Sequence, residues 1–197
     1  LKLNILRELS YNKRLPTKLH LNLARINSKE VRQNDFFFAI KGKKNDGNKF
    51  VSHAFKNKAS IAIVNQIQKK FQTNRQIKVE NTLNFLTNVS KIFRTNISTN
   101  LIAITGSCGK TTLKELLGET LKKISKVSIS PKSYNNKFGV PLSLLNLKEN
   151  DDFGILEVGM DKKGEIDYLS SVIQPDVSVI TNVNFAHAKN FKNIKQI

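Results

Sequence analysis

Residues 101–117 read LIAITGSCGKTTLKELL, and this order of residue types constrains the fold more than any other part of the chain. An apolar strand leads into a glycine-containing turn, and a lysine followed by two threonines opens an amphipathic helix. Such a turn points backbone N–H groups at a phosphate, and the helix N-terminus adds a partial positive charge. The stretch predicts a site for a nucleoside triphosphate within a strand–turn–helix unit.

The spacing of the two glycines is shorter than in the general P-loop pattern. That pattern has a glycine five positions before the second one, where this chain has Ile104, and the motif here reads G-x-x-G-K-T-T. A tight turn without a ligand could match the motif alone, but the strand before it and the helix after it favour a phosphate site. Lys110 is expected near the β- and γ-phosphates, and the Thr111 hydroxyl on Mg²⁺. The predicted nucleotide-binding residues are Gly106, Ser107, Cys108, Gly109, Lys110, Thr111 and Thr112.

Strands and helices alternate regularly in the second part of the chain. The predicted strands are 101–105, 126–130, 153–158 and 177–183, and the predicted helices are 110–123, 141–147 and 164–173. The residues expected to form one packed face of the first helix are Leu113, Leu116, Leu117 and Leu121. This alternation predicts an α/β fold with a mostly parallel, doubly wound sheet and with ligands at the carboxyl ends of its strands.

The first part of the chain predicts a separate, small α/β domain. Its predicted elements are a buried strand within 35–42 (DFFFAIKG), a helix within 50–59 and a strand within 60–65. Apolar positions within 83–95 predict a helix that leads into the strand before the glycine turn. We therefore expect an N-terminal domain of residues 1–82 and a domain of residues 83–197 that binds ATP or GTP, and the helical stretch without a capping sequence at Ile197 suggests that the second domain is truncated.

Composition excludes several classes of protein. One cysteine in 197 residues rules out a disulfide framework, and no apolar run is long enough to span a bilayer. The net charge of +18 would suit nucleic-acid binding, but the lysines are scattered among Asn and Ile residues. The sequence has no dense arginine block and no basic strand interleaved with aromatic residues. The net charge is better explained as general surface charge with some affinity for anionic substrates, and nucleic-acid binding is the alternative explanation.

Three further polar clusters carry possible chemistry. Glu157 ends an apolar run where a P-loop enzyme needs an acid to hold Mg²⁺, although a solvated acid at a strand end would look the same. Asn182 and His187 follow the next strand, where a histidine could bind a metal or a phosphate or have no such role. Asn135 and Asn136 form a polar loop that could bind a substrate or be a simple turn.

Taken together, these motifs resemble the Mur ligase family. TGSCGKTT, NNKFGVPLSLL, LEVGM followed by KGEI, and TNVNFAH occur in the family's order and with similar separations. The segment SKEVRQNDFFFAIKGKKNDGNKF resembles the uridine-nucleotide-binding domain of these enzymes. The NN-x-x-GVPLSLL form is similar to that of the members that join D-alanyl-D-alanine to UDP-N-acetylmuramoyl-tripeptide. The resemblance extends from about residue 26 to residue 197.

The resemblance implies a role for each motif. The stretch from Gly106 to Thr112 would bind the ATP phosphates, and Asn182 would lie near the nucleotide. Thr111, Glu157 and His187 would hold magnesium ions, and Lys110, Glu157 and His187 would form the catalytic set. Substrate contacts are implied for Ser28 at the uridine diphosphate and for Asn135 and Asn136 at the muramoyl-peptide. A bacterial, cytoplasmic, monomeric ligase without membrane insertion is implied, which forms an acyl phosphate with ATP before the amine attacks.

The sequence also departs from the family pattern. Asn27-Ser28-Lys29 stands where Asp-Ser-Arg is usual, which replaces a bidentate guanidinium with a point charge, and Ser133 replaces a usual Asn. The family's carbamylated lysine and C-terminal domain would follow Ile197, so the chain alone is expected not to turn over. The tripeptide-forming ligase and folylpolyglutamate synthase are the alternatives within the superfamily; GVPLSLL disfavours the first and FFFAIKG the second.

Overall fold

The chain folds into two compact α/β units. The computed structural model describes residues 1–10, 15–16, 18–42 and 45–184. The units comprise Leu1–Phe93 and Arg94–Ile197. Helix α3 (Thr82–Thr95) runs across the division between them, and it matches the connecting helix expected within 83–95.

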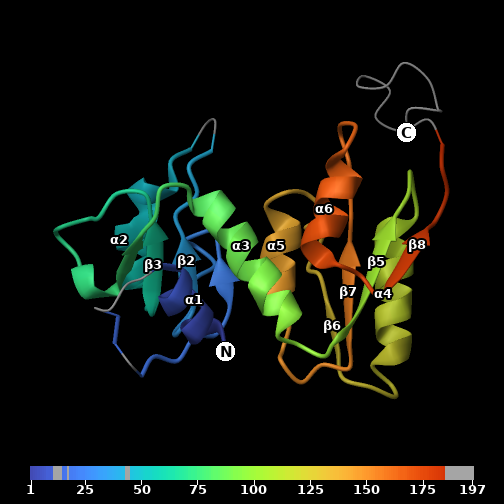
Figure 1. Ribbon diagram of the computed structural model, residues 1–197, viewed down its shortest axis with the longest axis horizontal. Coiled ribbons are helices and arrows are strands. Elements are labelled where there is room, and N and C mark those ends of the chain that lie inside the picture. Colours follow the sequence, from blue (N-terminus) through green and yellow to red (C-terminus); the bar gives the residue numbers. More distant parts are fainter. Residues whose placement is uncertain (11–14, 17, 43–44, 185–197) are drawn as a thin grey trace. The chain divides into compact units, whose positions relative to one another are not determined.

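The first unit contains a parallel sheet in the order β1-β2-β3-β4 (Figure 1). Its strands are β1 (Ala24–Arg25), β2 (Phe36–Phe38), β3 (Ile61–Val64) and β4 (Gln76–Lys78). Its helices are α1 (Lys2–Ser10), η1 (Gly47–Phe50), α2 (Val51–Lys56) and η2 (Thr73–Arg75). The strands expected within 35–42 and 60–65 and the helix within 50–59 are confirmed, whereas α1, β1 and β4 were not predicted.

Both faces of this sheet are covered, because all three residues of β2 are buried. Phe37 faces α2 and packs in a cluster with Val51 and Ala54 of that helix. The rings of Phe36 and Phe38 lie together with their centroids 5.7 Å apart. A strand that is apolar at every position is typical of parallel sheets with helices on both sides.

The second unit contains a parallel sheet in the order β6-β7-β5-β8. Its elements are β5 (Asn100–Thr105), α4 (Lys110–Leu121), β6 (Val127–Ile129), α5 (Gly139–Leu145), β7 (Phe153–Glu157), α6 (Glu165–Ile173) and β8 (Val177–Ile180). The predicted alternation and the doubly wound, parallel arrangement are confirmed. Since β6 and β7 lie on one side of β5 and β8 on the other, the loop after β5 is at the switch point where such sheets bind ligands.

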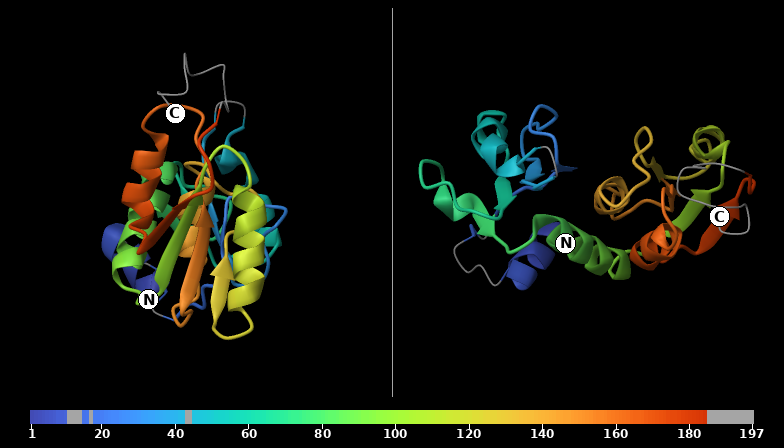
Figure 2. Two further views of the ribbon diagram at one scale, coloured as in Figure 1. Left: turned by 90° about the vertical axis from the view of Figure 1, so that its right-hand side faces the viewer. Right: turned by 90° about the horizontal axis from the view of Figure 1, so that it is seen from above.

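Helices cover both faces of the second sheet, with α4 on one side and α6 on the other (Figure 2, left). The apolar residues of α4 that pack on Ile102, Ile104 and Ile155 are Leu113, Leu117 and Leu121. The expectation that Leu116 shares this face is wrong, because its side chain is 63% exposed. At 100° per residue, Leu116 falls on the flank of the stripe that the other three leucines form.

No helix in the described part of the chain has both the length and the hydropathy needed to cross a bilayer.

Candidate nucleotide-binding and ligase site

The glycine turn joins β5 to α4 at the carboxyl end of the second sheet. Gly106 has φ +134°, and a Cβ atom there would lie 2.1 Å from the Thr181 hydroxyl oxygen. Gly109 has φ +81° and precedes the first residue of α4. Gly106 is therefore required both for its backbone conformation and for the close approach of Thr181, and Gly109 is required for its backbone conformation. The Lys110 ammonium folds back over the turn and donates to the carbonyl of Gly106 at 2.5 Å.

The residues after β8 hold the turn in place. The Asn182 carboxamide accepts from the Cys108 backbone N–H at 3.3 Å and donates to the Cys108 carbonyl at 3.1 Å. The Thr181 hydroxyl donates to the same carbonyl at 2.6 Å. The Ser107 N–H donates to the Asn182 carbonyl at 3.0 Å. Asn182 thus pairs with the turn as a peptide group would, adjacent to the predicted phosphate site.

Glu157 brings together residues from three separate segments. This carboxylate ends β7, beside β5, and its side chain is 2% exposed. The Thr111 hydroxyl donates to one carboxylate oxygen at 2.8 Å, and the Asn135 amide donates to the other at 2.8 Å. The predicted acid, the first hydroxyl of α4 and one of the paired asparagines therefore meet at one point.

The two asparagines of the loop before α5 have different surroundings. Asn135 reaches Glu157, and its backbone carbonyl accepts from the Gly159 N–H at 2.7 Å. A Cβ atom on Gly159 would lie 2.9 Å from the Asn135 side chain, so this approach requires glycine. The Asn136 side chain instead accepts from the backbone N–H groups of Phe138 and Gly139 at 3.0 and 3.1 Å, which organises the start of α5.

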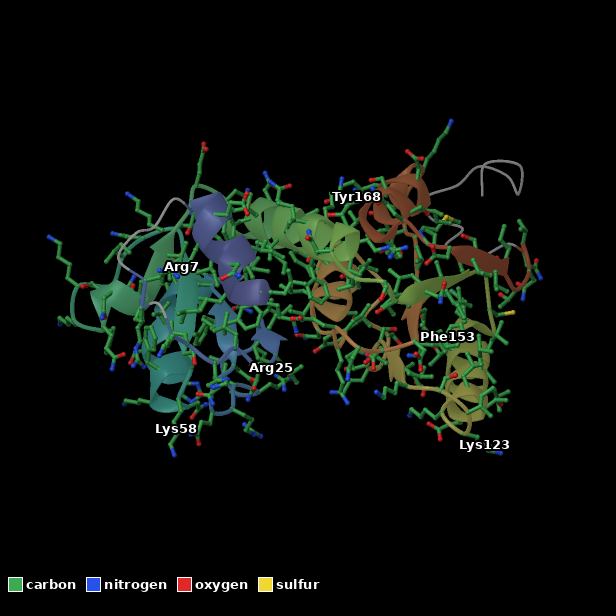
Figure 3. The ribbon with its side chains drawn as sticks, turned by 60° about the horizontal axis from the view of Figure 1, so that its bottom comes forward. Arg7, Arg25, Lys58, Lys123, Phe153 and Tyr168 are labelled. Carbon is green, nitrogen blue, oxygen red and sulfur yellow. The ribbon has the colours of Figure 1, made fainter. Side chains whose placement is uncertain are left out.

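A cavity of about 550 Å³ opens beside these residues. It is lined by Lys110, Asn135, Asn136, Lys137, Phe138, Gly159, Met160, Asp161, Lys163, Gly164, Glu165, Tyr168 and Leu169. Tyr168 lies on α6 in Figure 3 and is 43% exposed. Its three lysines outnumber its two carboxylates, Asp161 and Glu165, and together with several apolar side chains they suit an anionic ligand with an apolar part.

Glu165 on the cavity wall begins α6. Its carboxylate accepts from the backbone N–H groups of Asp161 and Lys162 at 2.6 and 3.0 Å. The hydrogen bond from Asp161 is the main cause that lowers the pKa of Glu165, and the bond from Lys162 and the charges of Lys162 and Lys137 act in the same direction. Glu165 therefore favours its ionised form at the N-terminus of the helix.

Ser28 and His187 are the two remaining predicted site residues. Ser28 belongs to the first unit, where it is buried with its hydroxyl 3.0 Å from His53 Nδ1, and its carbonyl accepts from the Asn57 side chain at 2.9 Å. His187 lies outside the described residues. Within the described ranges, no group of three or more His, Cys, Asp and Glu side chains is arranged to hold a metal ion.

The chain is similar to known proteins over most of its length. Residues 104–197 match the Mur ligase middle domain. A UDP-N-acetylmuramoyl-tripeptide–D-alanyl-D-alanine ligase from Buchnera aphidicola is 35% identical over 177 residues, which are 89% of this chain and 38% of the relative. The enzyme of the same name from Bacillus subtilis is 34% identical over 83% of this chain and 36% of its own length. The chain belongs to the Mur ligase family.

Solved structures of Mur ligases have the same fold. A MurF crystal structure from Acinetobacter baumannii has a TM-score of 0.83 and 30% identity over 98% of this chain and 43% of its own. MurF from Thermotoga maritima in complex with ADP has a TM-score of 0.74 and 34% identity over 89% of this chain and 40% of its own. The chain spans less than half the length of these Mur ligases.

The residues around Glu157 fit a magnesium ion. Mg²⁺ prefers oxygen ligands, and it is held through one or two protein groups together with phosphate and water oxygens. The Thr111 hydroxyl and the Glu157 carboxylate supply two oxygens 2.8 Å apart at the start of α4. A carboxylate has lone pairs beyond those used by Thr111 and Asn135, so this pair can accept a cation without rearranging the backbone.

Sequence reasoning missed one buried residue near this site. Lys114 lies one turn after Lys110 on α4, and its side chain is fully buried 3.9 Å from Glu157. A lysine between apolar helix positions is normally solvated, so the local pattern contained no signal of burial. Its partners come from distant parts of the sequence, and only the tertiary fold reveals them.

Proposed function

We propose that the chain is part of an ATP-dependent ligase that joins D-alanyl-D-alanine to UDP-N-acetylmuramoyl-tripeptide in bacterial peptidoglycan synthesis. The observation that carries the proposal is the meeting of Thr111, Glu157 and Asn135 beside the glycine turn. It joins the predicted nucleotide site to the predicted substrate loop. The names of the relatives support the choice of substrates.

The reaction follows from the chemistry of a carboxylate, which is a poor acyl donor. The terminal carboxylate of the tripeptide is phosphorylated by ATP, and the amine of D-alanyl-D-alanine then displaces phosphate from the acyl phosphate. Bound Mg²⁺ would neutralise charge on the phosphates. The protein's part is positioning and charge neutralisation, and none of its side chains becomes covalent.

Each site residue has a role in this proposal. Lys110 leaves the carbonyls of its own turn to bind the β- and γ-phosphates. Thr111 and Glu157 would hold the metal, with His187 as a further ligand, and Asn182 would fix the turn. Asn135 and Asn136 form the side of the site that the muramoyl-peptide approaches.

In the proposal, each of the two units binds a different substrate. The first unit, with Ser28, would bind the uridine diphosphate end, and the second unit would bind ATP. The Ser28 hydroxyl is buried against His53, so Ser28 would act on the uridine diphosphate through its neighbours and not by direct contact. We place the reaction in the cytoplasm, where ATP and the UDP-linked substrate are available, and we expect a monomer.

The decisive assay measures phosphate release by the intact enzyme. Release that requires both UDP-N-acetylmuramoyl-tripeptide and D-alanyl-D-alanine supports the proposal. Release without the dipeptide, or with unrelated amines, would overturn it. The tripeptide-forming ligase is tested in the same assay, with the UDP-linked dipeptide and a single diamino acid as substrates.

The high positive charge gives the alternative from another class, a nucleotide-dependent nucleic-acid-binding protein. Binding to DNA or RNA that falls steeply with salt and is unaffected by Lys110→Ala would favour this alternative. Absence of such nucleic-acid binding, together with ADP·Mg²⁺ binding that is lost in Lys110→Ala, favours the ligase.

A further inference from the structure

We propose that Lys114 is a positioning residue of the ligase site, which ties the nucleotide-binding helix to the substrate loop. Its ammonium donates to the carbonyl of Ser130 at 2.9 Å and to the carbonyl of Lys132 at 2.6 Å. The same nitrogen lies 3.1 Å from the Glu115 carboxylate and 3.9 Å from that of Glu157. This inference rests on the function proposed above, because it concerns the same site.

Burial of the Lys114 ammonium contributes little to the stability of the fold, because the loss of its hydration is unfavourable. The Lys114 side chain has no exposed surface, and the Glu157 side chain is 2% exposed. Taking an ammonium out of water is strongly unfavourable, and an apolar side chain of similar volume often packs there with equal or better stability. A lysine at this position is therefore better explained by what its three N–H groups hold than by the stability it adds.

The two carbonyls that Lys114 binds belong to the start of the loop that carries Asn135. Lys132 has φ +49°, a left-handed conformation that is unfavourable for a residue with a side chain. The hydrogen bond from Lys114 to its carbonyl supports this conformation. The chain turns there toward Asn135, whose side chain donates to Glu157 at 2.8 Å.

Lys114 also connects the loop to the acid by a second route. Ser130, whose carbonyl Lys114 binds, accepts from the Glu157 backbone N–H through its hydroxyl at 3.2 Å. Lys114 itself is not among the residues that line the cavity. It therefore acts on a ligand only through Asn135 and Glu157, by fixing where the amide and the carboxylate lie relative to Thr111.

The first test measures amide hydrogen exchange in the whole chain for Lys114→Met and Lys114→Arg. Lys123→Met is the matched control, because Lys123 lies just beyond the same helix and is exposed. Lys114→Met is expected to speed exchange of the Asn135 and Gly159 amides by about tenfold, as local opening of the loop becomes easier. Lys114→Arg is expected to restore most of the protection, since it keeps a charged donor.

The first unit serves as an internal reference, with amides of β3 expected to keep their rates in every variant. Unchanged exchange at Asn135 and Gly159 in Lys114→Met overturns the inference. Exchange that rises equally throughout the second unit also overturns it, because Lys114 would then be a structural residue alone. Equal loss of protection against exchange in Lys114→Met and Lys114→Arg would likewise overturn the inference.

The second test separates this inference from the proposed function. In the intact ligase, Lys114→Met is expected to raise KM for the UDP-linked tripeptide at least about tenfold, while the affinity for ADP measured without Mg²⁺ stays within about threefold. A loss of ADP affinity as large as the change in KM overturns the positioning role. Failure of the unsubstituted chain to bind ADP would instead contradict the proposed function, and the exchange result would stand separately.

Discussion

Asn182 shows how a single side chain can hold a phosphate-binding turn. Its carboxamide both accepts from and donates to the backbone of Cys108, so the turn needs the acceptor and the donor together. Lys110 meanwhile bonds to the carbonyls of Gly106 and Ser107 at 2.5 and 3.3 Å. The lysine can leave these carbonyls for a phosphate, whereas the asparagine has to remain for the turn to keep its shape.

Replacing Asn182 with aspartate is expected to weaken ADP binding about tenfold or more. The carboxylate cannot donate to the Cys108 carbonyl, and it adds a negative charge near the phosphates. Titration calorimetry with ADP and Mg²⁺ measures the change. Asn88→Asp, at an exposed position on α3, is the control and is expected to bind as the unsubstituted chain does. Equal affinity of the Asn182→Asp variant would show that the turn keeps its shape without this pairing.

At the scale of elements, regular alternation made most of the second unit predictable. The strand, turn and helix of residues 101–121 and the strand before Glu157 were placed from local pattern alone. The two-residue strand β1 and the strand β4 were missed, because such short strands are defined by pairing with neighbours and not by their own periodicity. Burial of Lys114 was missed for the same reason, since its partners lie outside the local sequence.

Two of the four leucines on α4 that the local pattern grouped together, Leu116 and Leu117, are expected to contribute differently to the free energy of unfolding. Leu117→Ala removes packing against Ile155 and its neighbours and is expected to lower the free energy of unfolding by about 2 kcal/mol. Leu116→Ala is expected to change it by less than about 0.5 kcal/mol, because that side chain is mostly exposed. Urea unfolding of both variants measures the difference, and equal effects would contradict the packing described here.

The first turn of α6 is expected to lose stability in acid. The pKa of Glu165 is lowered from 4.5, so its contribution is fully present above pH 4.5 and is lost as the pH falls through the lower, folded value. Glu165→Gln should therefore flatten the decrease in stability below pH 4.5. Thermal unfolding of both proteins between pH 3 and pH 7 tests this, and identical pH profiles would exclude the contribution.

At the scale of the whole molecule, the chain has two units with separate cores, and the proposed nucleotide site lies in the second. ADP with Mg²⁺ is expected to slow amide exchange in β5 and α4 more than in β2 and β3. A ligand stabilises the structure that it binds, in proportion to its concentration above its Kd. Hydrogen exchange with and without ADP measures this difference. Equal protection of both sheets would show that the two units open together.

The buried ammonium of Lys114 also has a consequence for biosynthesis. While the ribosome has made α4 but not β7, the carboxylate of Glu157 does not yet exist, and the carbonyls of Ser130 and Lys132 follow α4 in the chain. Of the partners described above, α4 itself supplies only the half-exposed Glu115 carboxylate, which does not satisfy a buried ammonium, so Lys114 has to stay in water until these groups emerge. The nascent helix therefore cannot close onto its sheet early, and the second unit is expected to fold in one late step.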